Sequence, residues 1–273
     1  MINRRKFLAR SSAALIGAAV MPLKVFPASG SIQGDKIEFR FLIASDGHFG
    51  QDGTPYTLYH ENLVRWIREE KNNNGLDLFF INGDLTHDNP GLLKEVKNYF
   101  DGAEVPYYPV KGNHDQVDNN GWQEIWGIPE NHTFEIGRNA FILLSTSDIK
   151  GKYLCADAGY LAGSLEKYKK YENVFVILHI PQFSHTDNGI DCPAVTDLFP
   201  KYPNVKAVFH GHEHNEDGLK NWNNFQYFFD GHFGGSWGTN YHGYRIVEVM
   251  RSGKIITYQF NPEIQPVVNK SSI

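Results

Sequence analysis

Five apolar runs along the chain end at residues that commonly bind metal ions, and this pattern constrains the fold more than any other feature. The runs cover residues 37–44, 77–81, 105–110, 174–178 and 205–209. They lead, in that order, into Asp46-Gly47-His48, Gly83-Asp84, Gly112-Asn113-His114-Asp115, His179 and His210-Gly211-His212-Glu213-His214. In α/β proteins, ligands collect beyond the carboxyl ends of the strands. The sequence therefore predicts that these groups converge on one rim.

The segments between these runs predict helices and an α/β fold. Residues 58–70 place Leu63, Trp66 and Ile67 at helical spacing with charged residues on the other face, and residues 92–100 repeat the pattern more briefly. Runs such as 77–81, and a further one at 140–144, lack polar alternation, which is typical of strands buried on both faces. Near the end, 244–249 and 254–260 predict a hairpin, from which we expect a second sheet.

The N-terminal segment differs from the rest. Within 273 residues, enough for one large globular domain at 29–273, four basic residues precede a short apolar run at 13–21. Asn3-Arg4-Arg5-Lys6-Phe7-Leu8 resembles a twin-arginine export signal, and the run is too short to span a bilayer comfortably. We expect a signal peptide at 1–28, read by the twin-arginine export machinery, no stable transmembrane anchor, and a periplasmic or extracellular protein. An uncleaved anchor is the alternative.

Charge argues against a broad nucleic-acid-binding surface. Removal of residues 1–28 takes away five basic residues and no acidic ones, which changes the formal charge from −5 to −10. Any attraction for phosphate must then come from a local positive centre. Export would place Cys155 and Cys192 in a compartment that permits a disulfide, but the sequence leaves a disulfide and two buried thiols equally open.

The residue types after the strands fit a pair of metal ions. Carboxylate, imidazole and amide oxygen together suit manganese, iron or zinc, and neither cysteine lies in a ligand pattern. Glycines before Asp84, Asn113 and His212 allow sharp turns and close approach of the ligands. Each motif alone is more often an ordinary turn or a core histidine. Five in this order, each after a strand, predict a dimetal site.

The ordered set resembles the calcineurin-like metallophosphoesterase superfamily, over a stretch from Ile43 to His214. The resemblance implies a four-layer sandwich of two mixed sheets flanked by helices. It implies a first metal held by Asp46, His48 and His214, and a second held by Asn113, His179 and His212, with Asp84 bridging both. By the same resemblance His114 is not a ligand but faces the substrate, and Asp115 holds its ring by a hydrogen bond.

Such a site predicts hydrolysis of a small-molecule phosphoester. Two metal ions would lower the pKa of a bridging water, while His114 stabilises the transition state or protonates the leaving group. Purple acid phosphatases carry an Asp-x-Asp opening and a metal-binding tyrosine in the second motif. Here the opening ends in His48 and the second motif reads Gly83-Asp84-Leu85-Thr86-His87, so the pattern is closer to the bacterial phosphodiesterase branch. A non-catalytic metal-binding scaffold and a nuclease are the alternatives. Monoester and diester substrates both remain open.

Substrate specificity is expected in loops that the motifs do not define. One further stretch, residues 231–238, is glycine-rich and contains Trp237, and we expect it to turn beside the site. Candidate pocket residues follow three of the motifs: His87, Asp88, Asn89, Trp122, Trp126, His185 and Asp187.

Overall fold

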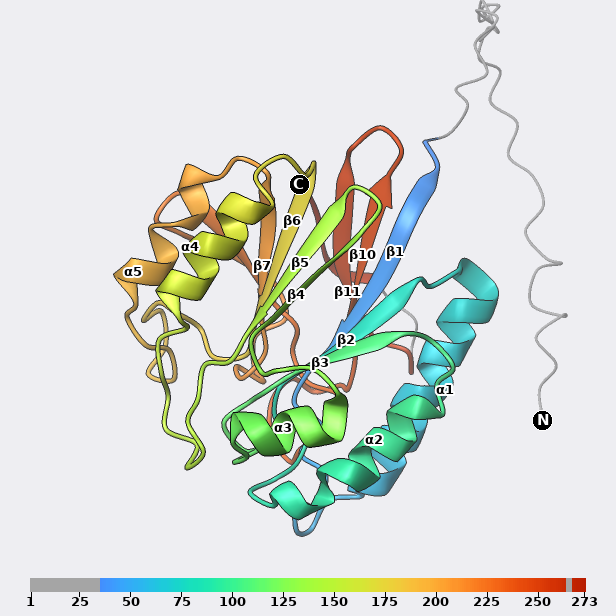
Figure 1. Ribbon diagram of the computed structural model, residues 1–273. Coiled ribbons are helices and arrows are strands. Elements are labelled where there is room, and N and C mark those ends of the chain that lie inside the picture. The colour runs from blue at the N-terminus through green and yellow to red at the C-terminus, as the bar shows by residue number, and fades with distance from the viewer. Residues whose placement is uncertain (1–34, 264–266) are drawn as a thin grey trace, which may run out of the picture. The chain divides into compact units, whose positions relative to one another are not determined.

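The computed structural model describes residues 35–263 and 267–273. In this part of the chain two six-stranded sheets pack face to face, and helices cover the outer face of each (Figure 1). The predicted four-layer α/β sandwich is therefore confirmed. The predicted signal peptide at 1–28 lies outside the described residues. Among the helices that the structure describes, none combines the length and apolar character needed to cross a membrane.

The first sheet is mixed. In spatial order its strands are β12 (Val267–Ser272), β11 (Ile255–Phe260), β10 (Tyr244–Met250), β1 (Ile37–Ala44), β2 (Leu78–Asn82) and β3 (Tyr107–Val110). Strands β1, β2 and β3 are parallel, whereas β10 pairs with β1 in antiparallel fashion. The C-terminal hairpin was predicted correctly, but the expectation that it forms a second sheet is wrong. It extends the first sheet because β10 pairs with β1 along the backbone. The apolar side chains of the two strands, such as Val247 and Phe41, then lie next to each other.

The second sheet comes from the middle of the chain. Its strands, in spatial order, are β4 (His132–Ile136), β5 (Asn139–Leu144), β6 (Asn173–Leu178), β7 (Val205–His210), β9 (Phe225–Phe229) and β8 (Leu219–Trp222). The four central strands are parallel and the two outer ones antiparallel. Strands β1, β2 and β3 of the first sheet and β6 and β7 of the second are the five that precede the predicted ligands.

Phenylalanines dominate the space between the sheets. Phe41 from β1 meets Phe141 from β5 and Phe175 from β6, with ring centroids 5.4 and 5.1 Å apart. All three rings are fully buried, and edge-to-face pairs of this kind add about 0.5–1.5 kcal/mol beyond the area that they bury. The inner core therefore fixes the two sheets against each other, and with them the two halves of the rim.

Helices complete the outer layers. Against the first sheet lie α1 (Tyr56–Asn74), α2 (Leu93–Asp101, preceded by the short η2, Pro90–Leu92) and α3 (Asn119–Trp126), and against the second α4 (Ala158–Lys167), α5 (Pro193–Thr196) and η3 (Phe199–Lys201). The predicted apolar face of α1 is confirmed, since Leu63, Trp66 and Ile67 are all buried. Both faces of each sheet are thus covered, which explains why the central strands show no polar alternation.

Candidate metal centre

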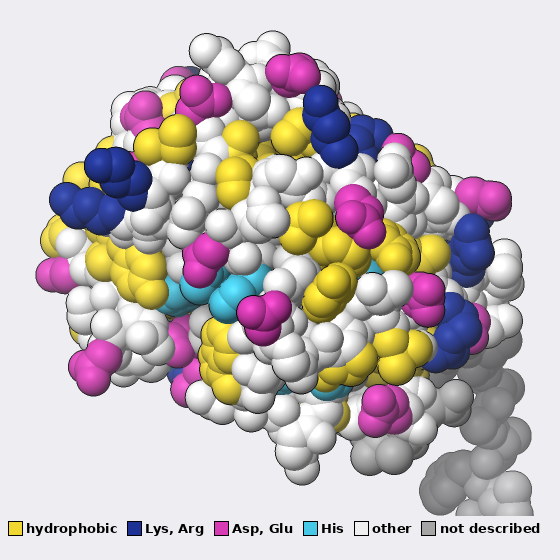
Figure 2. Space-filling view, turned by 90° about the horizontal axis from the view of Figure 1, so that it is seen from below, with side chains coloured by type: hydrophobic (Ala, Val, Ile, Leu, Met, Phe, Trp, Pro, Cys, Tyr) yellow, Lys and Arg dark blue, Asp and Glu magenta, His cyan; other side chains and the backbone are white. Residues whose placement is uncertain are grey.

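The predicted ligands meet where the carboxyl ends of the two sheets adjoin. Seen from that side, histidine side chains line a hollow on the surface (Figure 2). The three residues of the first predicted set form one compact group: Asp46, His48 and His214, whose ligand atoms all lie within 4.8 Å of one another. Nε2 of His214 lies 3.1 Å from both Asp46 Oδ1 and His48 Nε2. The first half of the rim and the end of β7 therefore build one site together.

A second group adjoins the first. It contains Asp84, His179 and His212, again with ligand atoms within 4.8 Å of one another. Asp84 Oδ2 lies 3.1 Å from His179 Nε2 and 3.8 Å from His48 Nε2. Asp84 thus stands between the two groups, as the resemblance implied for a bridging carboxylate.

Asn113 is held near the two ligand groups by its neighbour His114. The backbone N–H of His114 donates to Asp84 Oδ1 at 2.8 Å, which holds the third motif against the bridging carboxylate. Asn113 is only 7% exposed, and its Oδ1 has no hydrogen-bond partner among the residues that the structure describes. Its role as a ligand stays a prediction that this placement favours.

Within residues 35–263 and 267–273, several buried ligand atoms form no hydrogen bond of good geometry, although Asp46 Oδ1 and His179 Nε2 each have an ion-pair contact at 3.1 Å. The four atoms are Asp46 Oδ1, Asn113 Oδ1, His179 Nε2 and His212 Nε2. A buried polar atom without a partner costs about 1–3 kcal/mol, so four in one place require an explanation. All four can donate a lone pair, and together they offer the oxygen and nitrogen donors that zinc, iron and manganese accept. These residues fit a pair of metal ions.

Neighbouring groups orient three of the histidine rings. Nδ1 of His179 donates to the backbone oxygen of Asn82 at 2.7 Å, and Nδ1 of His214 donates to that of Trp237 at 2.9 Å. Nδ1 of His48 shares a 2.9 Å hydrogen bond with Nδ1 of His87. In each ring the remaining Nε2 faces the ligand group, which is the arrangement expected of metal-binding histidines.

The backbone at the ligands is strained. Asp46, His48, Asp84 and His212 all have positive φ, between 45° and 67°. Such a conformation costs residues with a Cβ about 1–3 kcal/mol each, and it persists where the surroundings require it, often at functional sites. Four of the seven predicted ligands share it, so the loops are shaped for the convergence of side chains at a cost in stability.

Glycines permit the close approach that was predicted for them. A Cβ on Gly83 would lie 2.2 Å from the His179 ring, and one on Gly112 would lie 2.1 Å from the backbone nitrogen of Asp84. Neither neighbour can move without disturbing a predicted ligand. These two positions therefore require glycine for steric reasons.

The carboxylates dominate the electrostatics of the site. Burial by itself would lower the pKa of His179, but the charges of Asp84 and Asp46 outweigh it and raise that pKa to about 10. Burial would raise the pKa of Asp84, yet His179 beside it holds that pKa well below its usual range. The protonated His179 ring thus balances the negative charge of Asp84 and Asp46 when no metal is bound. A bound metal ion would provide that positive charge in its place.

The surroundings of His114 differ from the expectation. The predicted hydrogen bond from Asp115 to its ring is not found. Nδ1 of His114 instead lies 2.9 Å from Asp88 Oδ1, which also accepts a 2.6 Å hydrogen bond from Gln116. Asp115 is buried and accepts the backbone N–H groups of Gly112 and Thr86, at 2.8 and 3.0 Å. It joins the second and third motif loops and does not hold the His114 ring.

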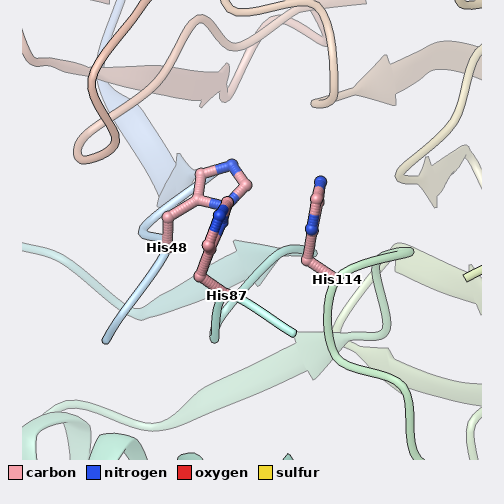
Figure 3. Close-up of side chains that lie close together, drawn as sticks. All are labelled: His48, His87 and His114. Carbon is pink, nitrogen blue, oxygen red and sulfur yellow. The ribbon is translucent and has the colours of Figure 1, made fainter. Parts of the chain in front are cut away.

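His87 is the residue whose importance the sequence pattern understated. Figure 3 shows its side chain beside those of His48 and His114, and its ring stacks on His114 with centroids 4.9 Å apart and planes 12° apart. Its position directly after the second motif marked it as a candidate pocket residue. The contact with Nδ1 of His48 adds a specific role, since it orients a predicted ligand.

Of the other candidate loop residues, some lie beside the ligand groups and some pack elsewhere. Trp122 and Trp126 both belong to α3. Trp122 is fully buried in the core, and Trp126 packs at the edge of the same cluster. His185 packs on Phe183 and Phe229. None of these is placed with the ligand groups. The stretch 231–238 does turn beside the site, as expected, and Trp237 stacks on His214 with centroids 4.3 Å apart.

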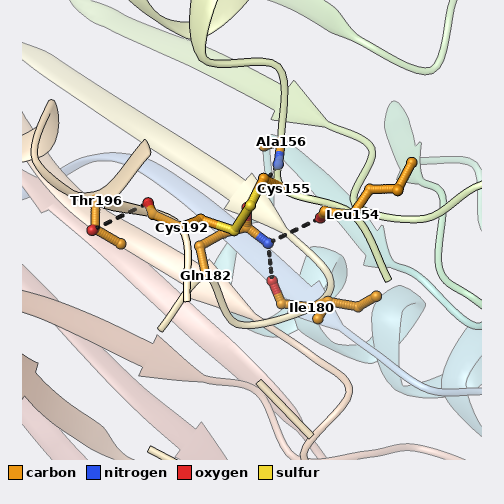
Figure 4. The surroundings of a disulfide bond; sticks show 7 residues. All are labelled: Leu154, Cys155, Ala156, Ile180, Gln182, Cys192 and Thr196. Carbon is orange, nitrogen blue, oxygen red and sulfur yellow. Dashed lines mark hydrogen bonds between the residues drawn. A yellow bond between two sulfur atoms is a disulfide. The ribbon is translucent and has the colours of Figure 1, made fainter. Parts of the chain in front are cut away.

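Cys155 and Cys192 form a disulfide, which settles the alternative that the sequence left open (Figure 4). It joins the segment after β5 to the segment after β6, and Gln182 ties both, accepting the N–H of Ala156 at 2.7 Å and, through its backbone oxygen, that of Cys192 at 3.1 Å. Two residues before Cys155, Tyr153 packs edge-on against the His212 ring at 4.8 Å. The disulfide therefore braces the side of the rim that carries the second ligand group.

Comparison with known proteins agrees with this geometry. Residues 39–216 match the family model described as calcineurin-like phosphoesterase. A 3',5'-cyclic-nucleotide phosphodiesterase from a Nostoc species is 28% identical over 151 residues, which cover 52% of this chain and 57% of that relative. The chain thus matches little more than half of the relative's length.

Solved structures share the fold. A dimetal phosphatase from Danio rerio superposes with a TM-score of 0.69 at 12% identity, covering 87% of this chain and 99% of that one. A purple acid phosphatase from yellow lupin gives 0.63 at 14% identity, covering 88% and 54%. At such identities the likeness concerns the fold alone, whereas the family model spans most of the sequence motifs. The chain therefore belongs to the calcineurin-like phosphoesterase family, as its motifs predicted.

Proposed function

We propose that this chain is a two-metal phosphodiesterase. The observation that carries the proposal is the pair of adjoining ligand groups, in which four buried ligand atoms form no hydrogen bond of good geometry within the described chain. The residues that would hold the ions are Asp46, His48 and His214 for the first, Asn113, His179 and His212 for the second, and Asp84 for both. When bound, two such ions activate water near neutral pH and polarise phosphoryl oxygens.

His114 is the chain's own acid at this site. Its Nδ1 is engaged by Asp88, which leaves Nε2 as the nitrogen that can meet a substrate oxygen. The side chain is 26% exposed, unlike the buried ligands around it, so a substrate can reach it. Held in this way, His114 can donate a proton to the leaving oxygen or a hydrogen bond to a phosphoryl oxygen in the transition state.

Charge around the opening favours a diester over a monoester. On the face that Figure 2 shows, hydrophobic and acidic side chains flank the exposed histidines, and lysine and arginine side chains lie farther out. A phosphomonoester dianion gains from additional cationic side chains, whereas a diester carries one negative charge and needs fewer. The Nostoc relative, a cyclic-nucleotide phosphodiesterase by name, supports the same preference.

Hydrolysis of two chromogenic esters tests the proposal. The purified protein is stripped with a chelator and reloaded with Mn²⁺, Zn²⁺ or iron, then assayed on bis(p-nitrophenyl) phosphate and p-nitrophenyl phosphate. We expect turnover only after reloading and a higher kcat/KM for the diester. Preference for the monoester would contradict the diester assignment. Turnover of neither ester, with two metal ions bound per chain, would favour a binding scaffold.

We also propose export by the twin-arginine route. The paired Arg4 and Arg5 and the disulfide support it, because disulfides persist in oxidising compartments. Cell fractionation of the natural host tests it. Replacement of both arginines by lysine should retain the protein in the cytoplasm, and unchanged export of that variant would contradict the route.

A further inference from the structure

Trp237 is the outermost of three stacked rings at the metal centre. The innermost ring is His232, whose centroid lies 5.0 Å from that of His214 with the planes 20° apart. Trp237 stacks on His214 at 4.3 Å with the planes only 9° apart. The indole therefore continues the stack beyond a predicted metal ligand.

The backbone holds this tryptophan firmly in place. Its carbonyl oxygen accepts the Nδ1 hydrogen of His214 at 2.9 Å, and the N–H of Thr239 donates to the backbone oxygen of His214 at 2.9 Å. Between them, Gly238 has a φ of 130°, and a Cβ there would lie 2.5 Å from the His232 ring. The loop is thus built to keep residue 237 beside the metal ligands, whichever side chain it carries.

Core packing does not account for the indole. The residue is 44% exposed, among the most exposed large apolar residues of the described chain. It lies 4.9 Å from His48 and 6.4 Å from His87, between ring centroids, and on the same loop it lines a pocket of about 300 Å³. Other rings line that pocket too, namely Tyr59, Tyr241 and His242. A flat apolar group therefore contacts a predicted metal ligand and also lines an open space large enough for a heterocycle.

We propose that Trp237 is a stacking platform for the base of a nucleoside phosphodiester, an inference that rests on the proposed phosphodiesterase function. A base placed on the free part of the indole would extend the existing stack while its phosphate lies at the metal centre. Stacking of a base on an aromatic side chain changes affinity by about 5- to 150-fold. A phosphodiester without a base, such as a glycerophosphodiester, would not gain this contact.

Selectivity between two diesters provides the kinetic test. We compare kcat/KM for adenosine 3',5'-cyclic phosphate and for glycerophosphocholine in the wild type, Trp237→Leu and Trp237→Phe. The ratio of the two values should fall by about 5- to 150-fold in Trp237→Leu and partly recover in Trp237→Phe. Trp222→Leu, at a similarly exposed tryptophan on β8, serves as the matched control and should keep the ratio. An equal loss on both substrates in Trp237→Leu would overturn the proposal.

Binding separates this proposal from the activity. Calorimetry on metal-loaded protein compares adenosine 5'-monophosphate with ribose 5-phosphate, which has the same phosphate and sugar carbons but a hydroxyl in place of the base. The nucleotide should bind about 5- to 150-fold more tightly in the wild type, and this difference should vanish in Trp237→Leu. If no diester is hydrolysed but the difference behaves in this way, the activity fails and the platform stands. A difference absent from the wild type, or retained in Trp237→Leu, refutes the platform.

Discussion

Two buried polar networks lie side by side in this molecule, and they differ in how their charged groups are paired. Around Arg245 the partners are satisfied: its guanidinium donates to Asp230 at 3.1 Å, to Thr257 at 3.3 Å and to the backbone oxygens of Asp217 and Phe229, both at 2.7 Å. At the metal centre, four ligand atoms form no hydrogen bond of good geometry with any described residue, and two of them, Asp46 Oδ1 and His179 Nε2, have only ion-pair contacts at 3.1 Å. Arg245 and the metal-centre residues Asp46, His48 and His179 are all fully buried, so burial does not explain the difference.

Asn82 joins the two networks and shows what separates them. Its side-chain amide donates to Asp230 at 3.2 Å, while its backbone oxygen accepts Nδ1 of His179 at 2.7 Å. The guanidinium of Arg245 has a hydrogen-bond acceptor at each of its three nitrogens, whereas at the metal centre several ligand atoms have only an ion-pair contact or no partner within the described residues. A buried network of this second kind needs positive charge, which the proton on His179 supplies without metal and which metal ions would supply when bound. The contrast therefore distinguishes a structural ion pair, here called the closed network, from a site for metal ions, here called the open network.

Removal of the shared carboxylate should break the open network completely. Asp84→Ala removes the carboxylate proposed to bridge both metal ions, so we expect fewer than two metal ions per chain. We also expect kcat/KM to fall by at least about 10⁴-fold, because the ions stabilise the charge of the transition state by several kcal/mol. Elemental analysis and diester hydrolysis measure the two effects. A variant that keeps two ions would show that Asp84 is not the bridge.

Loss of His114 should leave the metals in place. The ring lies outside both predicted ligand sets and is partly exposed, so His114→Ala should retain two ions per chain while kcat falls by about 10²- to 10⁴-fold. The same two measurements decide it. Unchanged kcat would remove His114 from the mechanism, and loss of metal would make it a ligand.

The closed network should respond in stability and not in metal content. Arg245→Met leaves the Asp230 carboxyl buried without its partner, which should cost about 3–5 kcal/mol of unfolding free energy in denaturant titrations. The cost should shrink at low pH, since burial raises the pKa of Asp230 to about 7 and the neutral acid tolerates the change. The double variant Arg245→Met with Asp230→Asn is the matched control and should recover part of the loss. A metal content that falls in folded Arg245→Met would contradict the separation of the two networks.

The metal ligands could be predicted from local sequence because each follows closely after an apolar run. Asp46, Asp84 and His179 could be placed at the rim from residue type and position alone, since the carboxyl ends of parallel strands share an edge. The outer layers followed from helical periodicity. What a ligand touches beyond the metal was less predictable, and Asp88, with its φ of 57°, reaches His114 only because of a turn that the sequence does not mark.

The pairing of strands far apart in the chain could not be predicted from the sequence. The hairpin at the C-terminus was clear from its apolar runs, but its membership of the first sheet depends on pairing between β10 and β1, about 200 residues apart. Arg245 is another case, because a charged residue in a strand reads as a solvent-facing position until the partner elements are known. The disulfide had the same uncertainty, since spacing alone does not bring two cysteines together.

The open network should take up metal in competition with protons. Because the pKa of His179 is raised to about 10, the metal-free site holds a proton at neutral pH that the ion must displace. The apparent affinity for Mn²⁺ should therefore rise by about tenfold per pH unit between about pH 6.5 and 8.5. Calorimetry in buffers of different ionisation enthalpy measures the released protons. Affinity that is constant across this range would show that His179 is neutral without metal.

The smallest effect concerns Asp88, which lies at the exposed edge of the open network. Its side chain is 50% exposed, so its contact with His114 is worth about 1 kcal/mol, and Asp88→Ala should lower kcat about fivefold with two ions still bound. Asp88→Asn retains an acceptor oxygen and should lose less. Asp115→Asn, at the buried aspartate that joins the motif loops, provides the contrast: there we expect a lower melting temperature and little change in kcat for the folded, metal-loaded protein. A larger loss of kcat at Asp115 than at Asp88 would restore the original expectation that Asp115 serves His114, since a residue that only joins loops should act through stability.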